Sequence, residues 1–330
     1  MRGRRIVFWH SVSYRRKRSG NWVRRLQLSS DLPVQVIEIL AHRSQRFQRY
    51  LWHRVREGWS HLTAIERQAV YRINPLWVPP RPAVDSHNRP NRDNGSGEDF
   101  LFMVHGMTAL LNDLLLMTPS SEMRVLEGWR HLPDPSNREY PVPKFQGSGL
   151  EELKTPEYYE QHLAPWEREL TRPGYLRNVN LGQLGSDIEF AIYRNAHLRW
   201  ATASAVGYRP TTEIVHCIGE QWDSPAYNYL GDTYSSLVNP IFWKLIGWVN
   251  DRVEDWKRAH ALALIVWRHT WMGDFKQPSV VNGQDAEMYN GAVDKELSSI
   301  DQILWEASTN NLDGFYRPHR FARLVDQDLD

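Results

Sequence analysis

Apolar residues recur at helical spacing over most of the chain. The first such stretch follows the cap pair Ser30-Asp31 and carries apolar residues mostly three or four positions apart: Val34, Ile37, Leu40, then Phe47 and Leu51. This spacing is typical of one face of an amphipathic helix. We therefore expect one long helix here.

A capping-box pattern, Thr63-Ala-Ile-Glu66, predicts a second helix that ends before Asn74-Pro75. A Pro-rich loop should follow and end in Arg92-Asp-Asn-Gly-Ser-Gly97, and a further helix should run from Glu98 or Asp99 to Met117. The many prolines suggest loops over 132–185, and helical patterns return at 188–203, 211–219, 234–259 and 294–307. The predicted fold is mainly α, a helical bundle core with long Pro-rich loops, forming one domain over 30–330.

Composition narrows the class of protein. Hydrophobic residues make up 41% and charged residues 24% of the 330, so the chain is globular rather than disordered. The formal charge of +1 argues against a nucleic-acid partner, and the absence of a run of roughly 18 apolar residues argues against a membrane partner. Cys217 is the only cysteine, which excludes an internal disulfide and Cys-cluster zinc sites. The 15 tryptophans require a thick core or an aromatic pocket.

The first thirty residues differ from the rest in charge. They contain nine Arg or Lys and no acid, which leaves 40 − 9 = 31 bases against 39 acids, a net of −8, in the remainder. We expect residues 1–29 to be a basic, disordered tail; a mitochondrial presequence is the alternative. The body is expected to be intracellular and cytoplasmic.

Two helical segments carry candidate chemistry. The first presents His105 within the apolar stripe of the 98–117 helix. On the second, Glu213, His216 and Glu220 stand at i, i+3 and i+7 and so share one face. Glu-x-x-His is a ligand pair of helical-bundle metal proteins, and with His105 from a facing helix it would suit one zinc ion with an open position. The alternative is an ordinary solvated polar face.

A motif further along the chain gives a family resemblance. The segment Asn239-Pro-Ile-Phe-Trp243, with the lead-in Asp232-Thr-Tyr-Ser-Ser-Leu, resembles the second metal-binding half of the type-3 copper superfamily of hemocyanins, phenoloxidases and tyrosinases. The resemblance implies the helical architecture of that family. It also places His105 and His216 at metal-ligand positions, and Phe242 and Trp243 beside the metal pocket.

The same resemblance shows departures from the family pattern. Thr212 and Ile246 stand where the family has ligating histidines, and no His-x-x-x-His pair precedes His105. About two of six copper ligands remain, so a coupled dicopper centre is not expected. Thr212 and Ile246 become candidate pocket residues instead.

Three functions follow from this pattern. The first is an enzyme of the cyclopenase type, a hemocyanin-like lyase or isomerase of secondary metabolism. It would use one divalent metal, zinc rather than copper, to rearrange a small aromatic substrate, with Glu213 or Glu220 as a further ligand or as acid/base. The second is a copper-dependent phenol oxidase whose missing ligands come from histidines elsewhere in the chain. The third is a metal-free scaffold or storage protein. A homo-oligomer is compatible with all three.

Overall fold

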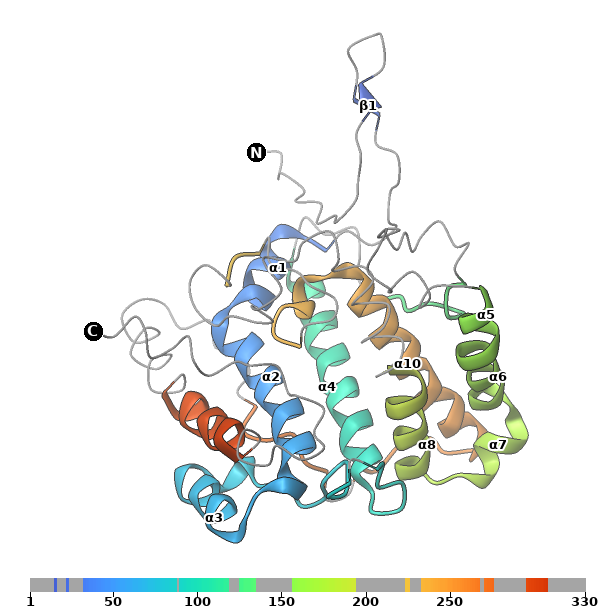
Figure 1. Cartoon of the computed structure of the whole chain (residues 1–330). Helices are drawn as coiled ribbons and strands as arrows, with labels where there is room; N and C mark the ends of the chain where they lie inside the picture. The colour runs from blue at the N-terminus through green and yellow to red at the C-terminus, as the bar shows by residue number, and fades with distance from the viewer. Residues whose placement is uncertain are drawn as a thin grey trace.

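The computed structural model describes residues 15–16, 22–23, 32–87, 89–118, 125–134, 156–193, 223–225, 233–267, 270–275 and 295–307. Within these residues the protein is mainly helical, as predicted (Figure 1). The named strands of the described part are two-residue strands, β1 (Arg15–Arg16) and β2 (Trp22–Val23), which pair antiparallel.

The prediction of one long helix from residue 34 onward is wrong, because the structure has two helices there, α1 (Val34–Ala41) and α2 (Arg43–Gly58). His42 separates them, and its ψ of 133° lies outside the helical region. The break lets the chain change direction, so both helices turn their apolar residues into the same core. Periodicity could not detect the break, because it leaves the spacing of apolar residues nearly unchanged.

The next helices confirm the predictions made from cap chemistry. Helix α3 (Ala64–Ile73) begins with the capping box: the Thr63 side chain accepts the amide N–H of Glu66 at 3.3 Å, and the Glu66 carboxylate accepts that of Thr63 at 2.6 Å. The 3-10 turn η2 (Pro75–Trp77) follows. Helix α4 (Ser96–Met117) starts two residues before the predicted range and ends where expected.

The prediction of loops over 132–185 is wrong for residues 156–185, which are mainly helical. That region contains α5 (Pro156–Tyr158), the π-helical turn η4 (Tyr159–Leu163), α6 (Ala164–Thr171), α7 (Pro173–Asn178) and α8 (Leu181–Asp187). Prolines in the first turn open α5, α6 and α7 instead of breaking them, since the missing N–H is not needed there. The π-helical turn η5 (Ile188–Tyr193) continues α8.

The last described elements complete the core. After the 3-10 turn η8 (Ser236–Val238), the Asn239 side chain caps α10 (Pro240–Ala259) by accepting the N–H of Ile241 at 2.9 Å. A helix over 295–307 lies beside α2, where Tyr50 donates to Asp301 at 3.1 Å. Figure 1 shows α2, α4 and α10 as three neighbouring long helices, with α8 on α4 and α7 on α10.

Helix α4 is the centre of this arrangement. It packs against α8 and α10, and one hydrophobic cluster connects it to residues from Leu32 to Ala307. Among the described helices it alone is long and apolar enough to cross a membrane, a test that buried core helices also pass. Half of its most apolar 18-residue stretch is buried inside the protein, as in a core helix.

Glycines set the closest approach between α4 and α8. A Cβ added to Gly97 would lie 2.1 Å from the carbonyl oxygen of Gly182, and one added to Gly185 would lie 1.9 Å from the carbonyl oxygen of Gly97. Only residues without a Cβ permit the two backbones to touch in this way. The N-terminal turn of α4 is thereby fixed against α8.

Candidate functional site

His105 lies half-buried on α4 and faces α10. Its Nδ1 is 3.2 Å from Oδ1 of Asn250, a residue one helical turn beyond Ile246 on α10. An amide oxygen only accepts hydrogen bonds, so a neutral ring in this contact would carry its proton on Nδ1 and its lone pair on Nε2. The contact orients the ring against a neighbouring helix.

A tryptophan ring packs against the His105 ring. The Trp267 ring lies 5.6 Å from it, centroid to centroid, and also 5.4 Å from the ring of Phe102, one turn earlier on α4. Met272 also lies against α4, because a Cβ added to Gly106 would be 3.5 Å from the Met272 side chain. The His105 side chain thus extends from α4 and contacts both α10 and the segment that follows α10.

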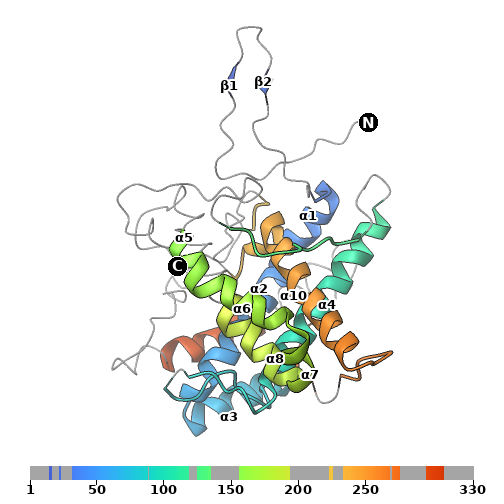
Figure 2. The ribbon, with the colours of Figure 1, turned by 90° about the vertical axis from the view of Figure 1, so that its right-hand side faces the viewer.

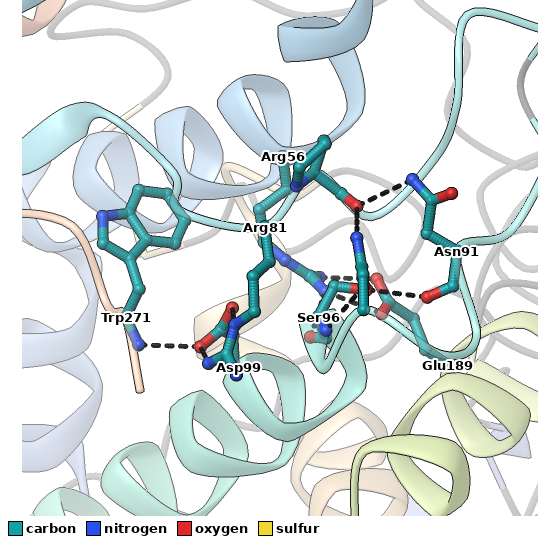
Figure 3. A network of polar contacts seen from close by, with 9 residues as sticks. Arg56, Arg81, Asn91, Ser96, Asp99, Glu189 and Trp271 are labelled. Atoms are coloured by element: carbon teal, nitrogen blue, oxygen red, sulfur yellow. Dashed lines mark hydrogen bonds and ion pairs between the residues drawn. The ribbon is translucent and has the colours of Figure 1, made fainter. Parts of the chain in front are cut away.

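A buried carboxylate holds that segment on α4. Asp99 Oδ1 accepts the amide N–H of Trp271 at 2.8 Å, and the Asp99 carboxylate also pairs with Arg81, whose Nε is 3.1 Å from Oδ2 (Figure 3). Burial raises the pKa of Asp99 above its usual value, and Arg81 opposes that shift. The Trp271 indole N–H donates to the carbonyl of Leu76 at 2.8 Å. These bonds fix the chain four residues after Trp267.

A second pair of charges lies beside the first. Arg56 of α2 and Glu189 of η5 form a two-pronged ion pair at 2.6 and 3.0 Å, with both side chains 1% exposed. Arg56 also donates to the carbonyl of Ser96 at 2.8 Å, and its guanidinium carbon lies 4.5 Å from the Trp52 ring centroid. Figure 3 shows this group meeting Asp99 and Arg81 at the start of α4. The network joins α2, α4 and η5 and so sets where α4 presents His105.

The predicted pocket residues on α10 are deeply buried. Phe242 and Ile246 are 0% exposed and Trp243 is 2% exposed. The guanidinium carbon of Arg49 lies 4.4 Å from the centroid of the Phe242 ring, and the Trp243 indole donates to the carbonyl of Leu237 at 2.6 Å. All three therefore form part of the packed core between α10 and α2.

Four predicted site residues, Thr212, Glu213, His216 and Glu220, lie outside the described residues. Their proximity to His105 is accordingly still a prediction. Among the residues that the structure does describe, no group of three His, Cys, Asp or Glu side chains is placed to hold a metal ion. Within this part of the chain His105 is the one predicted metal ligand.

Sequence reasoning missed Asn250 and Trp267, which both contact His105. Asn250 falls at i+4 from Ile246, so a search of the inward face of α10 for polar residues would have found it. Trp267 lies in a loop, and no spacing rule connects it with His105. The Trp267–His105 contact exists only in the folded chain, as does the Asp99–Trp271 bond nearby.

No protein-family model matches the chain, and a search of curated proteins finds no match.

Proposed function

We propose that this protein is an enzyme that binds one divalent metal, zinc rather than copper, through His105 and His216, on a scaffold of the type-3 copper kind. Its substrate would be a small aromatic metabolite, and its reaction a lyase or isomerase step of the cyclopenase type. The observation that carries the proposal is the hydrogen bond between His105 and Asn250.

That hydrogen bond has the form expected around a metal-binding histidine. Such residues donate the second ring N–H to an oxygen acceptor, which fixes the ring and directs the other nitrogen to the ion. The Asn250 amide oxygen lies in that position, so Nε2 of a neutral His105 ring would carry the lone pair that binds the ion. The described donors fit a single ion better than a copper pair, because the side chain of Ile246 has no donor atom.

Each residue has a distinct part in the proposal. His105 and His216 would hold the ion, which would supply Lewis-acid polarisation of a substrate oxygen. Glu213 or Glu220 would complete the ligand set or move a proton. Trp267 and Phe102 would offer an apolar, aromatic wall to the substrate, since the Trp267 ring lies beside His105 and the Phe102 ring packs on Trp267.

Metal analysis of the full chain tests the proposal. We expect about one zinc per chain after exposure to zinc and removal of excess, and loss of it in His105→Ala. Asn250→Ala should weaken zinc binding roughly 10–100-fold without removing a ligand. His260→Ala is the matched control, because Nδ1 of His260 already lies 3.0 Å from the backbone carbonyl of Trp256. Equal zinc content in the wild type and His105→Ala would contradict the proposal.

The metal-free scaffold is the second candidate, favoured by the packing of α10. Three side chains at the family's metal pocket, Phe242, Trp243 and Ile246, are at most 2% exposed and belong to the hydrophobic core. A protein of this kind would contain no stoichiometric metal, and its melting temperature would be the same with and without chelator.

A further inference from the structure

Gly106 interrupts α4 directly after His105. Glycine inside a helix destabilises it relative to alanine, because glycine loses more conformational freedom on folding. Gly97 has a reason to be glycine, since its added Cβ would collide with the backbone of α8. Among the described residues outside the α4 backbone, a Cβ added to Gly106 would meet only the Met272 side chain, at 3.5 and 3.7 Å, and the φ of Gly106 is not left-handed. Neither the described packing nor the backbone conformation therefore requires glycine at this position.

Gly106 lies on the side of α4 that reaches the surface. Residues 102, 106 and 109 stand at i, i+4 and i+7 and therefore share one face of the helix. Phe102 and Gly106 are half-buried, and Ala109 is exposed. Figure 2 shows α4 beside α10, with the orange chain that follows α10 turning back at the edge of the body. Because two small residues follow Phe102 on this face, side chains of α4 itself leave the helix backbone partly uncovered there.

The side chains that border Gly106 suit an aromatic ring. The Trp267 ring packs on the rings of both Phe102 and His105, at 5.4 and 5.6 Å between centroids. Met272 is half-buried like Trp267 and lies next to the position of the missing Cβ. Methionine is flexible and polarisable, and its sulfur packs favourably on aromatic rings. The Met272 side chain can therefore turn aside for a ring or pack on it.

The described residues near this face favour an uncharged ligand. Residues 100–112 of α4 contain no Asp, Glu, Lys or Arg. On α10, Asp251 beside Asn250 is exposed, and Glu254 and Lys257 pair with each other at 3.0 Å. A charged ligand would lose hydration here without gaining a counter-ion. A neutral ring avoids that loss and gains apolar contact area.

We propose that Gly106 determines which ligands the His105 site accepts, because the missing side chain leaves room for a flat, uncharged aromatic ring against the backbone of α4. Trp267 and Phe102 would border the ring, Met272 would cover it, and a polar substituent would point towards His105. A side chain at position 106 would occupy the place of the ring. This inference rests on the proposed function for the location of the site, and it adds the residue that limits the size of the ligand.

Equilibrium dialysis of the full chain against coumarin, a neutral bicyclic ring, tests the proposal. Coumarin carboxylate, which has the same ring and a negative charge, is the comparison ligand. We expect the wild type to bind coumarin more tightly than the carboxylate. Gly106→Ala should weaken coumarin binding at least about fivefold, and Gly106→Leu should weaken it further, because the added atoms overlap with the ring. Ala64→Leu is the matched control, since Ala64 is exposed on α3 and this variant should bind coumarin as the wild type does.

Melting temperatures of the same variants separate binding from folding. Gly106→Ala should raise the melting temperature while it lowers the affinity for coumarin, whereas a change at a purely structural residue would move both in the same direction. Equal coumarin affinity in the wild type and both Gly106 variants would overturn the proposal. Equal binding of coumarin and its carboxylate, or no binding by the wild type, would overturn it as well.

Zinc content of the same samples keeps the two proposals apart. Dialysis is carried out with the zinc-exposed chain and repeated after chelator, and the affinity ratio between the wild type and Gly106→Ala decides in both cases. A chain that holds no zinc but shows this ratio would refute the proposed metal chemistry alone. A chain that loses zinc in His105→Ala but binds coumarin equally in the wild type and the Gly106 variants would refute this inference alone.

Discussion

The ion pair between Arg56 and Glu189 is the sharpest test of how the interior is held together. Replacement of Glu189 by Gln removes one charge while keeping nearly the same shape. The Arg56 guanidinium, 1% exposed, would then keep its bond to the carbonyl of Ser96 and its contact with the Trp52 ring, but it would lose its bonded carboxylate; the nearby Asp99 carboxylate is already paired with Arg81. Water cannot replace the lost carboxylate at a site with this little exposure.

The expected cost follows from that burial. Breaking a buried ion pair by removing one partner costs about 3–5 kcal/mol, because a charge is left uncompensated. Total stabilities of folded proteins are roughly 5–15 kcal/mol, so the variant would lose a large part of its stability. Removing both charges should cost far less, since Arg56→Met/Glu189→Leu leaves no buried charge to solvate.

Urea unfolding followed by tryptophan fluorescence measures these differences. With a slope of about 3 kcal/mol/M, Glu189→Gln should lower the midpoint by roughly 1–1.7 M. Glu169→Gln is the matched control, because the Arg172–Glu169 pair is exposed and its loss should leave the midpoint unchanged. A midpoint for Glu189→Gln equal to the wild type, or a double variant as unstable as the single one, would refute this reasoning.

Three smaller predictions concern single positions. In α4, Gly97→Ala should destabilise the protein by about 1–3 kcal/mol, because the added Cβ collides with the backbone of α8. Gly106→Ala should stabilise it by about 0.5–1 kcal/mol, because there the added Cβ meets only the Met272 side chain, at 3.5 Å. Melting temperatures of the two variants that shift in the same direction would contradict this. Ala261→Gly should raise stability by about 1 kcal/mol by relieving the φ of +52°, as measured by urea unfolding; a loss of stability would show that the backbone there is unstrained. Hydrogen bonds from the backbone and side chain of Arg89 lower the pKa of Asp85 to about 2, so its contribution to stability is present above the unfolded pKa of about 3.9 and is lost as pH falls through 2. An NMR titration should show that low value, and Arg89→Gln should raise it; an unchanged midpoint would exclude the side-chain part of the effect.

Local chemistry in the sequence determined the helical class and several helix ends. The capping box at Thr63, the stop at Asn74-Pro75 and the end of α4 at Met117 were all predictable, because a cap or a proline acts through bonds within one turn. The helices opened by Pro156 and Pro173 carried the same kind of signal. They were predicted as loops because proline was counted as a breaker without regard to its place in the first turn.

Only the tertiary structure decided what surrounds His105. The sequence placed this histidine on an apolar helical stripe, but its partners Asn250 and Trp267 are 145 and 162 residues away along the chain. The burial of Arg56 likewise could not be predicted, because a charged residue enters a core only where a remote partner such as Glu189 neutralises it. Helical spacing and caps are read over a few residues, whereas the identity of a contact depends on which distant elements the whole fold brings together.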